Sequence, residues 1–389
     1  MLLFFVILII EILAGAEVDL FVPSLPELQS TFHLSPYMVQ LTLSVNFVSY
    51  CLCCLFAGTL GDRYNRRHVM LASLFIFVLG SITCAMATTF EMLLLGRCLQ
   101  GVGMAAPAVL AYAIISDHYP IEKQPAMLGI LNGMTTTAMA FAPTIGSYVN
   151  LYFNWRGNFT VLLIFSIICL IAGYLFIPSK KGNSTVSLSP SAYWSLLCSP
   201  PLLAYMAAIT FLVTAYWLFI GISPILFMQG LGVSLSQFGL YQGSLAGIFA
   251  VVSLLSPKIL NKLGQKTCFQ AGVIMTMISV ALIILVSLSA TKNPLIITAI
   301  LMFYAISVVF PVNILYPLSL EVLPNAKART AALIMAGRLI FTALALELTS
   351  YFYNGTFLNV GLAMAIFLIL SLFFIWTLIK KSWLMLDSE

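Results

Sequence analysis

The chain has 389 residues, of which 61% are hydrophobic and 7% are charged, and its formal net charge is +5. Soluble domains carry roughly 25% charged residues, so this composition excludes a water-soluble fold. The sequence contains no nucleotide-binding loop, no nucleophile constellation and no spacing of metal ligands. We therefore expect no enzymatic activity and no bound metal or cofactor.

Twelve apolar stretches approach the length of about 20 residues that a membrane-spanning helix needs. The first has no basic residue before it and runs past Phe21, so we predict a span there instead of a cleaved signal peptide. The chain is therefore predicted to be an all-α integral membrane protein. The predicted spans are 2–26, 37–60, 68–88, 91–115, 126–150, 157–178, 202–228, 235–257, 268–290, 294–318, 328–352 and 357–379.

The basic residues predict the orientation in the membrane, because cytoplasmic loops are enriched in Lys and Arg. With both termini in the cytoplasm of a bacterial cell and the spans in its inner membrane, two basic residues, Arg156 and Lys292, face the opposite side. Thirteen face the cytoplasm, namely Arg63, Arg66, Arg67, Lys123, Lys180, Lys181, Lys258, Lys262, Lys266, Lys327, Arg329, Lys380 and Lys381. The positive charge is thus a topology signal, and we expect no nucleic-acid partner.

The longest polar connection, from Ser179 to Pro200, divides the spans into two sets of six. We predict an N-terminal six-helix bundle at residues 1–178, a cytoplasmic linker at 179–200 and a C-terminal six-helix bundle at 201–389. Basic residues recur in the loop after the second span of each half, a weak repeat of the kind that pseudo-two-fold transporters show. Twelve spans with almost no soluble domain favour a transporter over a receptor or an anchored enzyme.

Ionisable residues inside a membrane are costly, so each is a functional hypothesis by default. Glu11 lies near the inner end of the first span and is expected to snorkel to the interface. Arg338 and Glu347 are predicted on opposite faces of one helix and do not pair with each other; they contact either substrate or neighbouring helices. The six such residues are Glu11, Glu17, Asp19, Arg97, Arg338 and Glu347.

Asp19 precedes two prolines, Pro23 and Pro26, which interrupt the hydrogen bonding of the first span. A carboxylate beside such a break can hold and release a proton as its surroundings change from wet to dry. Local capping is the alternative role. In a regular helix Glu17 and Asp19 point about 200° apart and do not face the same cavity. We predict Asp19 as the proton carrier, with Glu17 as the second candidate.

Arg97 and Gln100 are three residues apart in the fourth span and lie on one helix face. Arginine keeps its charge in almost any environment, so Arg97 can bias a nearby carboxylate without titrating itself. The neighbouring residues Gly96, Gly101 and Gly103 let another helix or a ligand approach closely. Asp19, Arg97 and Gln100 are also candidate substrate contacts, and a purely structural role for Arg97 is the alternative.

Two further spans carry weaker signals. In the fifth span, Pro143 predicts a kink and Gly146 predicts close helix packing. In the seventh span, an aromatic group that includes Tyr216 and Trp217 is a candidate stacking wall for an aromatic or cationic solute. A lipid-facing position for these rings is equally compatible with the sequence.

These motifs together resemble the major facilitator superfamily over essentially the whole chain. Residues 58–67, Gly-Thr-Leu-Gly-Asp-Arg-Tyr-Asn-Arg-Arg, are similar to its signature G-x-L-x-D-R-x-G-R-R between the second and third spans. Asn65 stands where the signature has a glycine. We expect the loop to keep its form, because asparagine tolerates the left-handed backbone better than most residues. The resemblance implies a cytoplasmic gate formed by Asp62, Arg63, Arg66 and Arg67, with Asp62 latching onto the other half, and Pro143 and Gly146 are further gating candidates.

A narrower resemblance is to the Bcr/CflA-type branch of twelve-span drug:proton antiporters. Its elements here are Asp-x-Phe-x-Pro-x-x-Pro at 19–26, Trp-Arg-x-x-Phe at 155–159 and Tyr-Trp-Leu-Phe-Ile at 216–220. The Arg97-x-x-Gln100-Gly101 element resembles the family's motif for proton coupling. The fifth span keeps part of the antiporter motif, reading Ala-Pro-x-x-Gly-Ser at 142–147, with two glycines replaced.

The resemblance implies a proton-coupled secondary transporter that exports drug-like or small metabolic compounds by alternating access and works as a monomer. The alternative is an importer or exporter of an organic anion or siderophore, with Arg97 and Arg338 holding a carboxylate. A third class, a sensor or membrane-embedded enzyme, is disfavoured because His33, His68 and His118 are spread over both sides of the membrane. The identity of the substrate depends on the shape of the pocket, which the sequence does not give.

Overall fold

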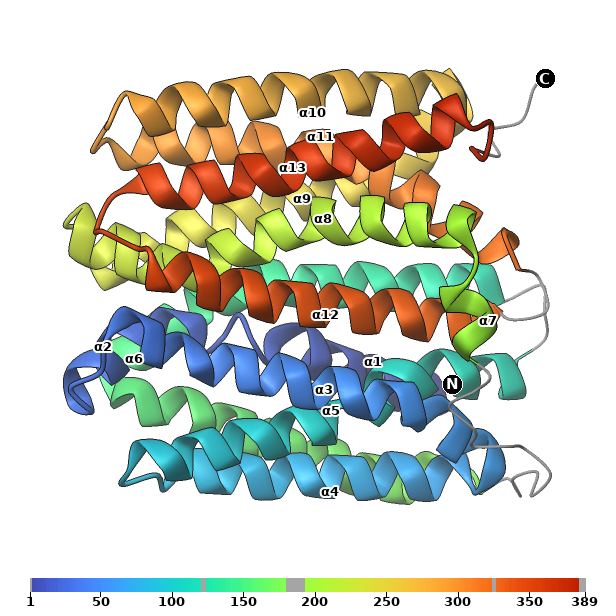
Figure 1. The fold of residues 1–389 in the computed structure, drawn as a ribbon. Coiled ribbons are helices and arrows are strands. Elements are labelled where there is room, and N and C mark those ends of the chain that lie inside the picture. Colours follow the sequence, from blue (N-terminus) through green and yellow to red (C-terminus); the bar gives the residue numbers. More distant parts are fainter. Residues whose placement is uncertain (1, 120–123, 180–192, 324–326, 385–389) are drawn as a thin grey trace. The chain divides into compact units, whose positions relative to one another are not determined.

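The computed structural model describes residues 2–119, 124–179, 193–323 and 327–384. The chain forms two compact units, Met1–Ser189 with Leu235–Leu240, and Pro190–Ser234 with Tyr241–Glu389. Every regular element in the described ranges is a helix (Figure 1). The boundary between the two units falls inside the segment 179–200 that was predicted to be the linker.

The first unit contains the helices of the predicted N-terminal half. Their bounds are α1 (Leu2–Ala16), the 3₁₀-helix η1 (Val22–Ser24), α2 (Leu25–Thr31), α3 (Pro36–Arg63), α4 (Arg66–Ala85), α5 (Phe90–His118) and α6 (Gln124–Phe176). Helix α6 contains two predicted spans in series, and its backbone leaves the helical conformation at Asn154 (φ 54°, ψ −174°). That break lies between the predicted spans 126–150 and 157–178. The helix continues past Pro143, so the kink predicted there stays a prediction.

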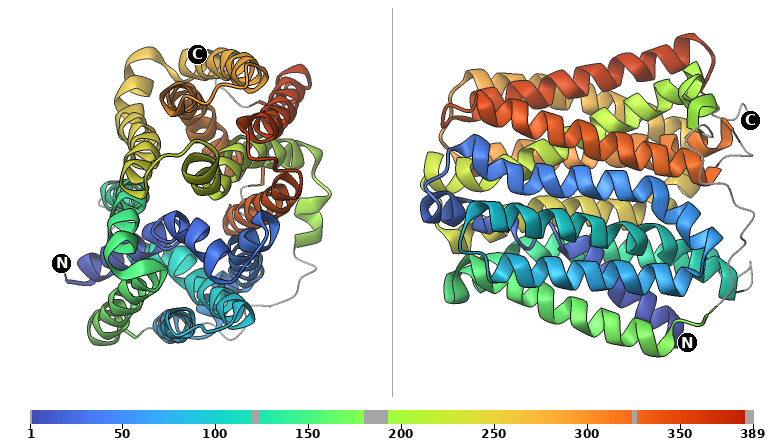
Figure 2. Two further views of the ribbon diagram at one scale, coloured as in Figure 1. Left: turned by 90° about the vertical axis from the view of Figure 1, so that its left-hand side faces the viewer. Right: turned by 60° about the horizontal axis from the view of Figure 1, so that its bottom comes forward.

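The second unit contains the helices of the predicted C-terminal half, except that Leu235–Leu240 at the start of α9 group with the first unit. Their bounds are α7 (Trp194–Leu197), α8 (Pro200–Pro224), the π-helix η3 (Ile225–Gly230), α9 (Leu235–Leu263), α10 (Gln265–Leu288), α11 (Pro294–Glu321), α12 (Lys327–Tyr351) and α13 (Phe357–Lys380). Within this unit α8 packs against α11, α12 and α13, and α10 packs against α11 and α13. Figure 2 shows the helices of each unit nearly end on, running roughly parallel to one another.

Ten segments of the described residues are long and apolar enough to cross a membrane, and α1 is a shorter apolar helix. Because the segment Gly133–Phe176 contains two predicted spans, and the first predicted span comprises α1, the turns after it and η1, these segments correspond to the twelve predicted spans. The protein is therefore a multi-pass, all-α membrane protein. Large apolar side chains such as those of Phe141, Ile145 and Tyr152 are exposed on the outside of α6, as expected of a surface that lipid covers.

Polar capping residues set the beginnings of several helices. The Ser35 side chain accepts a hydrogen bond from the amide of Met38 at the start of α3, and the Thr89 side chain accepts one from Met92 at the start of α5. Such caps satisfy amides that have no partner within the helix and typically contribute about 1 kcal/mol. They mark the points where the chain re-enters the apolar region.

The predicted first span, residues 2–26, is interrupted as its prolines indicated, but the interruption begins earlier than Pro23. Helix α1 ends at Ala16, and residues 17–21 form turns before η1 begins at Val22. Three α-type bonds of 2.9 to 3.2 Å persist, from the amides of Glu17, Leu20 and Val22 to the carbonyls of Leu13, Ala16 and Val18. Because Pro23 has no amide hydrogen, the hydrogen bonding cannot continue regularly through it. The disturbance begins several residues before the proline, and this places Glu17 and Asp19 outside a regular helix.

Candidate functional site

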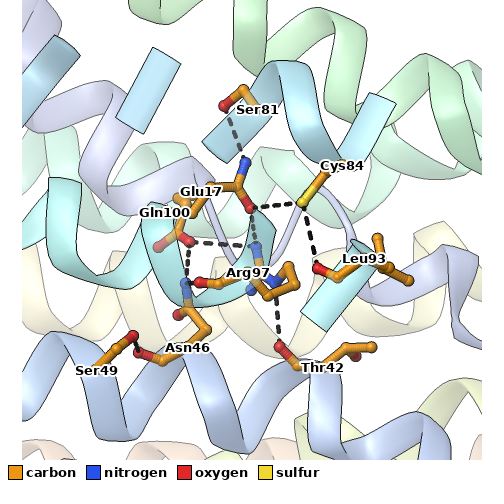
Figure 3. A network of polar contacts seen from close by, with 9 residues as sticks. All are labelled: Glu17, Thr42, Asn46, Ser49, Ser81, Cys84, Leu93, Arg97 and Gln100. Carbon is orange, nitrogen blue, oxygen red and sulfur yellow. Dashed lines mark hydrogen bonds and ion pairs between the residues drawn. The ribbon is translucent and has the colours of Figure 1, made fainter. Parts of the chain in front are cut away.

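Arg97 lies in the N-terminal third of α5 (Phe90–His118) and is completely buried. Its Nη1 donates to Oε1 of Gln100 at 2.7 Å and lies 3.3 Å from Oε1 of Glu17, while its Nε donates to the backbone oxygen of Thr42 at 3.1 Å (Figure 3). A buried arginine requires such partners because an unpaired charge is costly in a low-dielectric interior. The guanidinium therefore joins the turn after α1 to helices α3 and α5.

Glu17 is held from two sides. Besides its ion pair with Arg97, Oε1 of Glu17 accepts a hydrogen bond from Nδ2 of Asn46 at 2.8 Å. The same Nδ2 also contacts the backbone oxygen of Arg97 at 3.2 Å. Asn46 lies on α3 and is buried, and the sequence analysis did not identify it as a site residue. Its side-chain amide within the apolar stretch 37–60 was the available signal, since buried polar side chains need hydrogen-bond partners.

Gln100 extends these contacts to α4. Its Nε2 donates to Oγ of Ser81 at 2.9 Å, and its Oε1 accepts from Arg97. The predicted shared face of Arg97 and Gln100 is therefore present. We call Glu17, Thr42, Asn46, Ser81, Arg97 and Gln100 the Arg97 network; it draws on four segments of the first unit (Figure 3).

Glycines next to Arg97 allow the helices to approach closely enough for this network. A Cβ on Gly101 would lie 2.3 Å from the backbone oxygen of Asn46 on α3, and one on Gly96 would lie 2.9 Å from the backbone nitrogen of Cys84 on α4. Real Cβ atoms do not come so close, so no larger residue fits without moving the helices. The close approach predicted at these glycines is made by helices α3 and α4.

Asp19 is 1% exposed, and neither of its carboxylate oxygens has a hydrogen-bond partner within the described ranges. It lies within electrostatic range of Glu17. The nearby side chain of Phe21 stacks under Arg97, with the guanidinium carbon 4.9 Å from the ring centre. Because the chain is not a regular helix here, the angle of about 200° predicted between Glu17 and Asp19 from helix geometry does not apply. Of these two carboxylates, Glu17 pairs with Arg97 and Asp19 remains without a cation partner in the described structure.

The expectation that Glu11 snorkels to the interface is wrong. Glu11 is 3% exposed, and its Oε2 accepts a hydrogen bond from Oγ1 of Thr135 on α6 at 3.2 Å. A Cβ on Gly15 would lie 2.5 Å from the backbone oxygen of Thr135, so α1 and α6 are in close contact beside Glu11. This packing covers the carboxylate, which sequence position alone does not reveal.

The Trp-Arg-x-x-Phe motif holds the segment after α1 in place. Trp155 and Phe159 are buried and make an edge-to-face contact at 6.1 Å, and Phe159 packs against Phe21 at 4.8 Å. The Oγ of Ser24 in η1 accepts from Nδ2 of Asn158 at 2.7 Å. Aromatic contacts and a buried hydrogen bond therefore fix the residues on both sides of Pro23 against α6.

A further contact with α6 involves Gly146. A Cβ there would lie 2.0 Å from the backbone oxygen of Leu20, next to Asp19. Any side chain at this position would collide with the backbone of the turn. Gly146, predicted to permit close packing, therefore contacts the segment that carries Asp19.

The loop between α3 and α4 forms its contacts within the first unit. Nη1 of Arg66 lies 2.7 Å from Oδ2 of Asp117, and it donates to the backbone oxygen of Ala113 at 2.8 Å, both on α5. Nη2 of Arg67 donates to the backbone oxygen of Tyr174 on α6 at 2.7 Å. The Arg63 guanidinium lies 5.8 Å from the ring centre of its neighbour Tyr64.

The predictions for Asp62 and Asn65 in this loop have different outcomes. The side chain of Asp62 lies outside the described part of the chain, and its latching role stays a prediction. The left-handed backbone expected at Asn65 is wrong, since this residue is extended (φ −118°, ψ 120°). Its side chain instead caps α4 by accepting from the amide of Arg67 at 3.0 Å. Asparagine replaces glycine here because the cap uses its side-chain oxygen.

The remaining candidates belong to the second unit. Arg338 on α12 is partly buried, and its Nη2 lies 2.9 Å from Sδ of Met335 in the same helix. Glu347 is partly buried further along α12. Tyr216 and Trp217 on α8 contact each other edge to face at 5.9 Å, and Tyr216 stacks on Phe249 of α9 at 6.0 Å. The aromatic group predicted on this span is therefore a set of packed, half-buried rings.

The fold and the buried charges define a polytopic membrane protein of the transporter class. The sequence profile of the Major Facilitator Superfamily matches residues 7–346. The chain belongs to this superfamily, and it is a transporter and not an enzyme, as predicted.

Similar proteins include the "Multidrug resistance protein MdtL" of Citrobacter koseri, 26% identical over 257 residues, and that of Salmonella heidelberg, 27% identical over 260 residues. Each match covers 66% of this chain. It also covers 66% of the relative, so this chain spans slightly less than two thirds of the relative's length.

Solved structures share the fold at low identity. The crystal structure of a D-xylose-proton symporter matches with a TM-score of 0.79 at 13% identity, covering 96% of this chain and 97% of that one. The human organic anion transporter MFSD10 matches with a TM-score of 0.70 at 16% identity, covering 96% and 98%. At such identities the similarity establishes the twelve-span fold and carries no information on the substrate.

Proposed function

We propose that the chain is a proton-coupled secondary transporter that exports drug-like or small metabolic compounds across a bacterial inner membrane, with both termini in the cytoplasm. The observation that carries this proposal is the arrangement of three buried charged groups, in which Arg97 pairs with Glu17 while Asp19 has no cation partner among the described residues. The similar proteins named multidrug resistance proteins support efflux as the direction of transport.

Asp19 is the proton carrier in this proposal. An ionised carboxylate without a cation is costly inside a membrane, whereas the neutral acid is not. Asp19 therefore takes up a proton while the surrounding helices shield it and releases the proton when its surroundings open to water. Glu17 is less suited to this task, because Arg97 and Asn46 already compensate its charge.

Arg97 is a positioning and electrostatic residue in this mechanism. It keeps its charge, fixes Glu17, and sits on the ring of Phe21 within the segment that carries Asp19. A change at Asp19 is thereby transmitted to helices α3, α4 and α5 through the Arg97 network. The loop around Arg66 is proposed as the cytoplasmic gate, and Asp19, Gln100, Tyr216 and Trp217 as substrate contacts.

Transport in inverted membrane vesicles with an imposed pH gradient tests this function. Protonating the vesicle interior should drive accumulation of a fluorescent lipophilic cation, and Asp19→Asn should abolish it. The exposed carboxylate of Glu91 on α5 provides a matched control, since Glu91→Gln makes the same chemical change outside the site. Gradient-independent accumulation by the wild-type protein would exclude proton coupling. Comparing the metabolites in spent medium from cells with and without the protein would then identify natural substrates.

A second candidate function is proton-coupled transport of an organic anion. Its supporting observation is Arg338, whose Nε is buried without a hydrogen-bond partner in the described ranges and whose Nη2 contacts only a thioether there. A thioether is a weak acceptor, so this guanidinium retains donors for a carboxylate ligand. Uptake of labelled carboxylates that depends on Arg338, without transport of cations, would favour this candidate over drug efflux.

A further inference from the structure

A groove of about 550 Å³ lies on the second unit, between the first turns of α10 and the C-terminal end of α13. It is lined by Lys266, Phe269, Gln270, Val273, Ile274, Ile379, Ser382 and Leu384. Ile274 and Ile379 remain 57% and 53% exposed, so the groove opens toward the surroundings of the unit. It contains none of the residues assigned to transport.

The lining changes from polar to apolar along the helix. Lys266 is the second residue of α10, and Gln270 follows one turn later, whereas Val273 and Ile274 lie one further turn along. From Lys266 to Ile274 the helix rises about 12 Å. On α13 the order is matching, since the polar Ser382 lies beyond the helix end and Ile379 within it. The polar residues Lys266, Gln270 and Ser382 thus lie at the helix termini, beside the apolar Phe269 and Leu384, and the lining further along both helices is apolar.

The chain after α13 forms a fixed wall of the groove. The amides of Trp383 and Leu384 both donate to the backbone oxygen of Leu378, at 2.9 and 3.2 Å. The hydroxyl of Tyr205 on α8 donates to the backbone oxygen of Trp383 at 3.1 Å. These hydrogen bonds hold Leu384 against the end of α13.

The end of the groove at Lys266 lies at the membrane interface. Trp376 is 52% exposed and stacks with the ammonium group of Lys380, 4.6 Å from the ring centre, in the last turn of α13. Tryptophan and lysine at the end of a span are typical interfacial anchors. Lys266 also belongs to the basic residues predicted on the cytoplasmic side, where the membrane surface is negatively charged.

We propose that this groove binds an anionic phospholipid of that leaflet, with the phosphate at Lys266 and Gln270 and one acyl chain along Val273, Ile274 and Ile379. Charge complementarity selects the anionic lipid, because the lining includes a lysine and no acidic residue. A free phosphate ion would leave the apolar remainder of the groove unfilled. Bound lipid would join α10 and α13 on the outside of the unit, away from the transport site.

Native mass spectrometry of the delipidated full-length protein tests this proposal. The probes are phosphatidylglycerol and phosphatidylcholine with identical acyl chains, and inorganic phosphate as a competitor. We expect phosphatidylglycerol to bind in preference to phosphatidylcholine. Lys266→Gln should weaken the binding of phosphatidylglycerol about fivefold, the effect of one basic residue at an anionic surface. Lys262→Gln, an exposed lysine in the last turn of α9 that does not line the groove, is the matched control.

A second variant tests the acyl part of the site. Val273→Trp fills the groove without altering charge, and it should also weaken the binding of phosphatidylglycerol while the protein still elutes as a folded species. Equal binding of both lipids, or unchanged phosphatidylglycerol binding in both Lys266→Gln and Val273→Trp, would overturn the proposal. Displacement of the lipid by inorganic phosphate to the same degree in wild type and Val273→Trp would also overturn it, since a phosphate site alone would then explain the binding.

Discussion

The Nη1 atom of Arg97 lies 3.3 Å from Oε1 of Glu17, and the carboxylate of Asp19, two residues further along, has no hydrogen-bond partner in the described structure. Both carboxylates are 1% exposed. One arginine thus compensates one of two neighbouring acids. Because only Glu17 is paired, we expect Glu17 to stabilise the fold and Asp19 to carry the proton. The first two predictions test these roles.

Replacing Asp19 by asparagine should abolish proton-driven transport while the protein still inserts and folds. The amide has nearly the same shape as the carboxylic acid but does not titrate, and no described hydrogen bond to Asp19 is lost. Transport in inverted vesicles and the elution profile in detergent check the two parts. Glu91→Gln is the control. If Asp19→Asn transports normally under a pH gradient, the carrier role passes to Glu17.

Replacing Glu17 by glutamine should instead lower stability. The change leaves the guanidinium of Arg97 buried without its anion, and breaking a buried ion pair on one side costs about 3–5 kcal/mol. The double variant Glu17→Gln/Arg97→Gln should recover part of this loss, because no unpaired charge remains. Thermal unfolding of the purified variants in detergent measures the effect. Equal melting temperatures for wild type and Glu17→Gln would contradict a structural role for the pair.

Gly146→Ala should disturb the segment that carries Asp19. The added Cβ would lie 2.0 Å from the backbone oxygen of Leu20, so either α6 or the turn must move. We expect lower transport at similar expression, and a larger effect for Gly146→Val. Gly247→Ala on α9 is a matched control, since a Cβ there meets no atom within 4 Å. Unaltered transport in Gly146→Val would show that this contact is not needed.

The cytoplasmic loop gives a prediction about conformational balance. Arg66→Ala removes an ion pair with Asp117 and a hydrogen bond to Ala113. Because the paired side chains are 23% and 20% exposed, the loss of stability should stay near 1 kcal/mol. Cross-linking of cysteines placed at the cytoplasmic ends should nevertheless report a shifted population of states. Lys380→Ala, which removes the contact of an exposed cation with Trp376 at the end of α13 and leaves the loop unchanged, is the control.

The spans were predictable because a membrane leaves the helix as the main solution for an apolar stretch of this length. Pro23 predicted that the first span is interrupted, but it did not predict that the interruption begins after Ala16. The sequence remains apolar at Ala16 and Val18, so no local residue pattern predicts that α1 ends at Ala16. Contacts of Gly146 and Phe159 with this segment stabilise the turn, and they come from far along the chain.

The charged residues of the candidate site were predictable from the sequence, but the pairing between them was not. Glu17, Asp19 and Arg97 stood out because ionisable groups are rare inside spans. Which acid receives the arginine depends on where the turn after α1 directs each side chain, and this follows from tertiary packing. Asn46 was not predicted, because a side-chain amide in an apolar stretch is compatible with ordinary helix packing until its partners are known.

The last prediction concerns the charge of Arg97. Its guanidinium compensates the charge of Glu17, which lies within electrostatic range of Asp19, so in Arg97→Gln the uncompensated charge of Glu17 should make proton release from Asp19 harder. The pH profile of substrate-induced proton release from purified protein should then move to more alkaline values, and transport should need a more alkaline medium. Arg97→Lys should retain part of the activity, because the charge persists while the fork that reaches both Glu17 and Gln100 is lost. If Arg97 only packs helices, Arg97→Gln lowers the yield and the surviving folded protein keeps its profile. An unshifted profile in well-folded Arg97→Gln would remove this residue from proton coupling.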